Sequence, residues 1–71
     1  MKFPRDIAGR EVIAALRRLG FTVQRQTGSH VQLQRDNTHV TVPMHNPVRT
    51  GTLKNVLRQA GVTMEQLLEN L

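Results

Sequence analysis

Three histidines, His30, His39 and His45, are the side chains of this sequence best suited to chemistry, and none falls on an apolar stripe. Gly28 and Ser29 precede His30. A glycine lets the backbone turn or approach a ligand closely, and a strand that follows it would hold the imidazole rigidly. An imidazole, with an unperturbed pKa of about 6.5, can take up and return a proton near neutral pH. We therefore expect His30 to be catalytic, with Gly28, Ser29 and His45 as accessory residues.

Other catalytic schemes fit the sequence less well. The five acidic residues are scattered over predicted helix ends and a turn, so they do not form the carboxylate pair of glycoside hydrolysis or two-metal chemistry. A Ser–His–Asp triad would require Ser29 to face His30, but neighbouring residues of a strand point to opposite sides. Zinc held by the three histidines is a geometric alternative, but we expect no metal and no other cofactor.

RNA cleavage suits a single imidazole because the substrate supplies its own nucleophile. Once a base removes the proton of the 2′-hydroxyl, that oxygen can attack the adjacent phosphate without a protein nucleophile or a metal. A positioned acid or base contributes about 10² to 10⁴ in rate, and cations on the phosphate add electrostatic stabilisation. DNA lacks this hydroxyl, so we expect it to be spared.

The segment from Arg49 to Lys54 places two cations, two hydroxyls and free backbone N–H groups at a predicted helix start, where anions bind. We take Arg49, Thr50, Thr52 and Lys54 as candidates for contacts to RNA phosphates. The alternative is that Thr50 only caps the helix.

Charge and composition also favour a nucleic-acid partner. Ten Lys and Arg against five Asp and Glu leave a net charge of +5 on 71 residues, which suits a polyanion, although charge can also serve solubility alone. The sequence has no Tyr or Trp, so base stacking on an aromatic platform is not indicated.

Several classes of protein are excluded by what the sequence lacks. Without cysteine it can form neither disulfides nor thiolate–metal sites. Its longest apolar run, Val12 to Leu16, is far shorter than the roughly 18 to 20 residues of a membrane span. The start, from Met1 to Asp6, has no apolar stretch typical of a signal peptide. We expect one cytoplasmic domain over residues 1–71, with no membrane and no small-molecule cofactor.

Periodicity predicts the elements that must position these side chains. Apolar residues at helical spacing predict a helix over residues 9–19 ended by Gly20. Alternation then predicts strands over 21–27, 30–34 and 39–43, with a tight turn at Asp36-Asn37. After a loop over 44–49, a helix should run from a Thr50 cap to Gly61, and a capping box at Thr63 should open a short last helix.

These elements predict an α+β fold of order α-β-β-β-α, with a three-stranded antiparallel sheet, helices packed on one face and a short C-terminal helix. Phe21 and Val23 should face the core, and in either sensible register His30 should lie opposite Pro43 or His45. The other sheet face should stay open. It could be no more than the wetted side of a two-layer domain. Its expected residues are Thr22, Gln24, Gln26, His30, Gln32, Gln34, His39 and Thr41.

At this point the sequence resembles a known family, the HicA (YcfA-like) toxins, from about residue 9 to residue 69. The motifs that carry the likeness are Gly28-Ser29-His30, Val42-Pro43-Met44-His45, Gly51-Thr52-Leu53 and Val56-Leu57-Arg58-Gln59-Ala60-Gly61. The resemblance implies a fold like a double-stranded-RNA-binding domain. It also implies the metal-independent mRNA interferase (endoribonuclease) of a type II toxin–antitoxin system, neutralised by a cognate HicB antitoxin.

The resemblance also bears on single residues. The family's catalytic histidine corresponds to His30, and its second recurring histidine corresponds to His45, whereas His39 has no counterpart. Leu67 stands where the family often has phenylalanine, which we expect to be a change within the core.

Two other functions stay open from the residues. A non-catalytic module of the same fold would bind double-stranded RNA and leave it intact. A helix-turn-helix over residues 50–71 would read DNA, but the last helix presents Glu65 and Glu69, which phosphates would repel.

Overall fold

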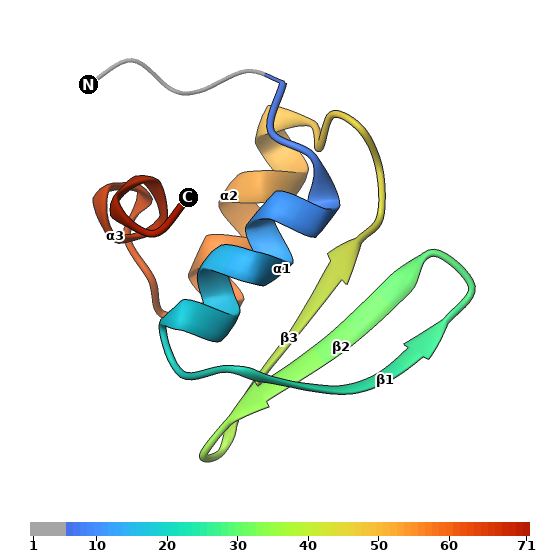
Figure 1. The fold of residues 1–71 in the computed structure, drawn as a ribbon, viewed down its shortest axis with the longest axis vertical. Helices are drawn as coiled ribbons and strands as arrows, with labels where there is room; N and C mark the ends of the chain where they lie inside the picture. The colour runs from blue at the N-terminus through green and yellow to red at the C-terminus, as the bar shows by residue number, and fades with distance from the viewer. Residues whose placement is uncertain (1–5) are drawn as a thin grey trace.

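The computed structural model describes residues 6–71 of the chain, so the expectation about a signal peptide concerns a segment that lies largely outside the described residues. The strands form one antiparallel sheet in the order β1-β2-β3 (Figure 1). This arrangement confirms the predicted α+β fold, which is that of a double-stranded-RNA-binding domain with one more short helix. The elements are α1 (Gly9–Arg18), β1 (Thr22–Thr27), β2 (His30–Arg35), β3 (Thr38–Pro43), α2 (Thr50–Ala60) and α3 (Met64–Glu69).

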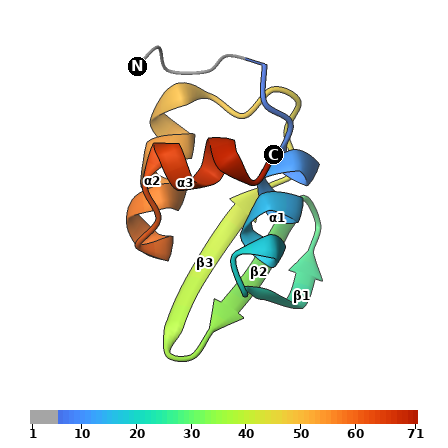
Figure 2. The same ribbon diagram turned by 60° about the vertical axis from the view of Figure 1, so that its left-hand side comes forward.

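The helices and one face of the sheet enclose a single apolar core. Helices α1 and α2 pack against the sheet chiefly at β3, and α3 packs against α1 (Figure 2). Leu67 is fully buried, which confirms that it belongs to the core. Within residues 6–71, no helix combines the length and the apolar character needed to cross a bilayer. The largest fully buried side chains are Leu16, Leu33, Leu53, Leu67, Val12, Val40 and Val42.

Glycines end two of the helices and a capping box begins the third, as predicted. Gly20 (φ 101°) and Gly61 (φ 68°) take the left-handed conformation after α1 and α2. Thr63 and Gln66 form the capping box of α3, each backbone N–H donating to the other's side-chain oxygen. The cap predicted at Thr50 is wrong. Arg49 is extended and its carbonyl accepts from Leu53 N–H at 2.8 Å, so Thr50 is already the first helical residue.

Two-residue turns join the strands. Gly28 and Ser29 connect the paired residues Thr27 and His30, and Gly28 has a φ of 59°. A left-handed first turn residue, which glycine supplies without strain, is what a two-residue hairpin of this kind requires. The second turn is the predicted Asp36-Asn37, in which Asp36 has a φ of 53°.

A β-bulge in β1 changes which side chains reach the open face. Val23 pairs with Leu33, but the next pair is Arg25 with Gln32, so one extra residue is inserted at Gln24. The alternation therefore loses phase. Gln26 pairs with the core-facing Val31, and its predicted place on the open face is wrong, whereas Arg25 joins that face.

Val23 departs from the predicted core. It shares the face of Leu33, as expected, but 41% of its surface is exposed. The reason is that β1 is an edge strand, while the helices cover the sheet chiefly over β3.

Candidate functional site

A hollow of about 340 Å³ brings together side chains that lie far apart in the sequence. It forms where the start of β2, the end of β3, the following loop and the first turn of α2 meet. Four predicted site residues line it: the two histidines His30 and His45, together with Arg49 and Thr52. Pro43, Pro47 and Val48 complete the lining.

His30 is the first residue of β2 and directly follows the Gly28-Ser29 turn. It pairs with Pro43 on β3, which is one of the two registers expected from the sequence. Since its neighbour Val31 is buried among the core residues, His30 faces the open side of the sheet, and the ring is exposed. Within residues 6–71 the imidazole makes no hydrogen bond, so both ring nitrogens can meet a ligand.

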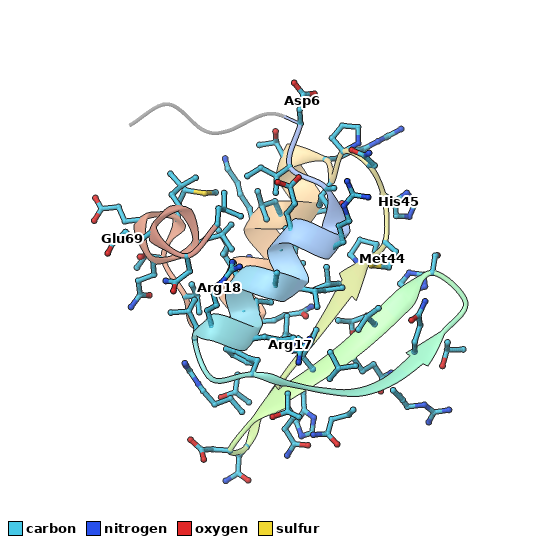
Figure 3. The ribbon with its side chains drawn as sticks, viewed as in Figure 1. Asp6, Arg17, Arg18, Met44, His45 and Glu69 are labelled. Atoms are coloured by element: carbon cyan, nitrogen blue, oxygen red, sulfur yellow. The ribbon has the colours of Figure 1, made fainter. Side chains whose placement is uncertain are left out.

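Three backbone hydrogen bonds hold the loop that carries His45. Met44 N–H donates to the Ser29 carbonyl at 2.6 Å, which ties the loop to the turn before His30. Gly9 N–H donates to the His45 carbonyl at 2.8 Å, and Val48 N–H donates to the Ile7 carbonyl at 2.7 Å. In Figure 3, His45 points away from the helices at the outer side of this loop.

Gly9 allows this loop to approach the start of α1, a role that the sequence pattern did not indicate. A Cβ on Gly9 would overlap the Pro43 carbonyl oxygen and lie only 2.9 Å from the Met44 Cα. The signal available in the sequence was a glycine at the first position of a helix, where glycine is otherwise unfavourable. Its missing side chain sets the position of His45 relative to His30.

The remaining predicted residues are not gathered at the hollow. Thr50 and Lys54 are exposed on the first turns of α2 and do not line it. Ser29 lies in the turn rather than on a strand. His39 pairs with Gln34, four residues along β3 from Pro43, which corresponds to about 13 Å. The three-histidine zinc site is therefore not formed, and nowhere in residues 6–71 do three His, Asp or Glu side chains group as metal ligands.

The surroundings of the hollow are cationic. Arg49 lines it, and no carboxylate does. Arg10 lines an adjoining hollow of about 100 Å³ on the other side of His45. The first turn of α2 contains no acidic residue, and its leading N–H groups have no partner within the helix. An anion in the hollow would therefore meet two imidazoles, the Arg49 guanidinium and the start of α2, with Arg10 nearby.

Comparison with known proteins gives one family. A family model described as the HicA toxin of bacterial toxin–antitoxin systems matches residues 9–62, from the first residue of α1 through the three strands to just beyond α2. No curated protein matches the chain.

The close approach at Gly9 predicts a specific sensitivity of stability. We expect Gly9→Ala to lower the free energy of unfolding by about 1 to 3 kcal/mol, because the added methyl group displaces the loop backbone. Urea denaturation measures the effect. Gly51→Ala is the matched control, since a Cβ there meets nothing within 4 Å in the first turn of α2. Equal unfolding free energies for the two variants would contradict the role given to Gly9.

Proposed function

Because the chain belongs to the HicA toxin family of toxin–antitoxin systems, we propose that it is an mRNA interferase, an endoribonuclease in which His30 transfers the proton. HicA toxins are in general mRNA interferases that act with a cognate antitoxin. The observation that carries the proposal is the hollow itself, in which the exposed His30 lies with His45 and Arg49 and without any carboxylate.

The proposed reaction needs only the RNA and these side chains. His30 takes the proton of a ribose 2′-hydroxyl, whose oxygen attacks the adjacent phosphorus. The bond from phosphorus to the 5′-oxygen breaks, leaving a 2′,3′-cyclic phosphate on one product and a 5′-hydroxyl on the other. His45, the accessory residue that lines the same hollow, would give the leaving oxygen its proton. No metal and no cofactor takes part.

The cations and the start of α2 support the same step electrostatically. Arg49 and the backbone N–H groups near Thr52 would stabilise the negative charge that develops on the phosphate. Thr50 and Lys54, on the exposed side of the same helix start, would contact the RNA backbone beyond the hollow. Gly28 and Ser29 would act by fixing the turn that presents His30.

The proposed protein partner is a HicB-type antitoxin that covers the open sheet face and His30. A single partner surface could close the hollow, because its lining is contributed by one corner of the sheet, the adjoining loop and the first turn of α2. We place the reaction in the cytoplasm, where mRNA is found.

A non-catalytic module that binds double-stranded RNA is the alternative. It would use the same cations, so the two functions are distinguished by whether the bound RNA is cut or left intact. The exposed, hydrogen-bond-free imidazole of His30 beside a second imidazole favours the enzyme, since RNA binding alone requires neither ring.

His30→Ala is the first test. We expect cleavage of RNA, assayed on a gel in the presence of EDTA, to fall by at least about 10²-fold because the proton-transfer group is lost. The thermal melt should stay nearly unchanged, since the residue is exposed. An oligonucleotide with 2′-deoxyribose throughout is the substrate control and should not be cut by either protein. Full activity of the variant would refute the mechanism, and wild-type protein that binds RNA without cutting it would favour the binding module.

His45→Ala tests the division of roles between the two histidines. We expect slower cleavage of ordinary RNA but near-normal cleavage of a substrate with sulfur in place of the leaving 5′-oxygen. A thiolate, whose conjugate acid has a pKa of about 8.5, leaves without needing a proton. His30→Ala should not be rescued by this substrate. Rescue of His30→Ala in place of His45→Ala would exchange the roles, and a fully active His45→Ala would remove His45 from the mechanism.

Arg49→Ala tests the phosphate contact. In a His30→Ala background, which prevents cleavage, we expect weaker RNA binding and a salt dependence reduced by about 0.7 in the slope of log K against log salt concentration. Arg17→Ala is the charge-matched control, because Arg17 is exposed on α1 and lines neither hollow beside His45 (Figure 3). An equal change in the slope of log K against log salt concentration for both variants would contradict the role of Arg49 as a phosphate contact.

A further inference from the structure

A third hollow, of about 300 Å³, lies on the open face of the sheet, further along the strands from His30. All three strands contribute to it: Gln24 from β1, Gln32 and Gln34 from β2, and His39 and Thr41 from β3. It shares no lining residue with the hollow at His30. Its polar lining consists of hydrogen-bonding side chains without a carboxylate or a lysine.

Most of these side chains have unused hydrogen-bonding groups. Within residues 6–71, the side chains of Gln24, Gln32 and His39 make no hydrogen bond. Gln34 uses only its amide nitrogen, which donates to the Asp36 carbonyl at 2.7 Å, so its amide oxygen is free to accept. The hollow therefore offers several neutral donors and acceptors to a ligand that presents both.

The β-bulge builds this arrangement. Because it inserts one residue, Gln24 is left unpaired between Val23, which pairs with Leu33, and Arg25, which pairs with Gln32. Gln24 lines the hollow beside Gln32, and Arg25 brings a cation to the same face. A regular strand would have turned Arg25 to the opposite face.

We propose that this hollow binds one unpaired nucleobase of the RNA whose backbone enters the hollow at His30, an inference that rests on the proposed function. A glutamine amide pairs a donor and an acceptor with a base edge, most favourably with adenine. Proteins read RNA sequence mainly through unpaired bases. Charge complementarity favours RNA as the occupant, since Arg25 pairs with Gln32 of the lining and the described residues of the open face include no carboxylate.

The spacing places the base within about two nucleotides of the cut. Gln32 and Gln34 follow His30 by two and four residues on β2, or about 7 and 13 Å along the strand. This strand pairs on both sides, so the distance is fixed by the sheet. The hollow should therefore select the position of the cut relative to a particular base rather than speed the chemical step.

The test is the double variant Gln24→Ala/Gln32→Val, in which valine keeps the strand preference at position 32. Wild-type and variant proteins cleave a pool of randomised RNA, and the ends are sequenced to give the base preference at each position around the cut. For wild type we expect a preference on the order of tenfold at one position within about two nucleotides of the cut. The variant should lose that preference and still cut RNA that lacks the preferred base at the wild-type rate.

Asn55→Ala is the matched control, since it removes an amide from the exposed side of α2, where, among residues 6–71, that side chain bonds only Arg58 of the same helix. A preference that persists in the double variant, or that disappears equally in the control, overturns the proposal. Cleavage of no RNA by the wild-type protein would count against the proposed function instead. The same comparison is then made on the Kd values of A, C and U homopolymer oligonucleotides, where loss of discrimination in the double variant alone supports the hollow and unchanged discrimination overturns it.

Discussion

The close packing of the first residue of α1 against the loop after β3 is the contact on which the site depends. Gly9 has no side chain, so its N–H reaches the His45 carbonyl while the Pro43 and Met44 backbones lie directly against it. The bond from Met44 to Ser29 joins the same loop to the turn before His30. A helix start, a hairpin turn and a loop are thereby fixed to one another, and the two imidazoles come to one hollow although both histidines are exposed.

Local sequence signals made most of the fold predictable. Which side chains of β1 reach the open face depended instead on how β1 pairs with β2. Three helix boundaries depend on interactions within a few residues, so the sequence alone locates them. They are the ends of α1 and α2 at Gly20 and Gly61 and the start of α3 at the Thr63 capping box. The bulge at Gln24 leaves no comparable signal, because polar residues run from Gln24 to Thr27 and no apolar residue marks a change of phase. The extra residue is set by the pairing of β1 with β2, which a single strand's pattern does not contain.

The histidine of the candidate site could be predicted because the glycine turn and the strand that follows it are local. The cap predicted at Thr50 failed because the loop bond from Val48 to Ile7 and the extended Arg49 set where α2 begins. Gly9 could not be interpreted from sequence, since its role depends on a loop more than thirty residues away.

The arginines show why net charge is only a partial guide to binding. Arg35 donates to the Leu19 carbonyl at 2.7 Å and lies 4.5 Å from the centre of the Phe21 ring, which ties β2 to the end of α1. Arg18 donates to the Asn70 carbonyl at 2.6 Å and joins α1 to the end of α3. These two cations stabilise the fold. Three other arginines lie in or beside the hollows: Arg49, Arg10 and Arg25. The position of the cations, rather than their number, therefore determines which of them are available to bind a ligand.

In the proposed function, the central strand β2 links cleavage to base selection. His30, Gln32 and Gln34 alternate on one face of β2, and both neighbouring strands hydrogen-bond to it, so none of the three can shift along the strand without breaking the sheet. A base bound at the glutamines and a phosphate bound at His30 would then be separated by a rigid length of backbone. The same geometry bears on inhibition. A partner that covers the open face of β2 would exclude the base directly, whereas closing the hollow at His30 would also require contact with Arg49 and Thr52 at the start of α2.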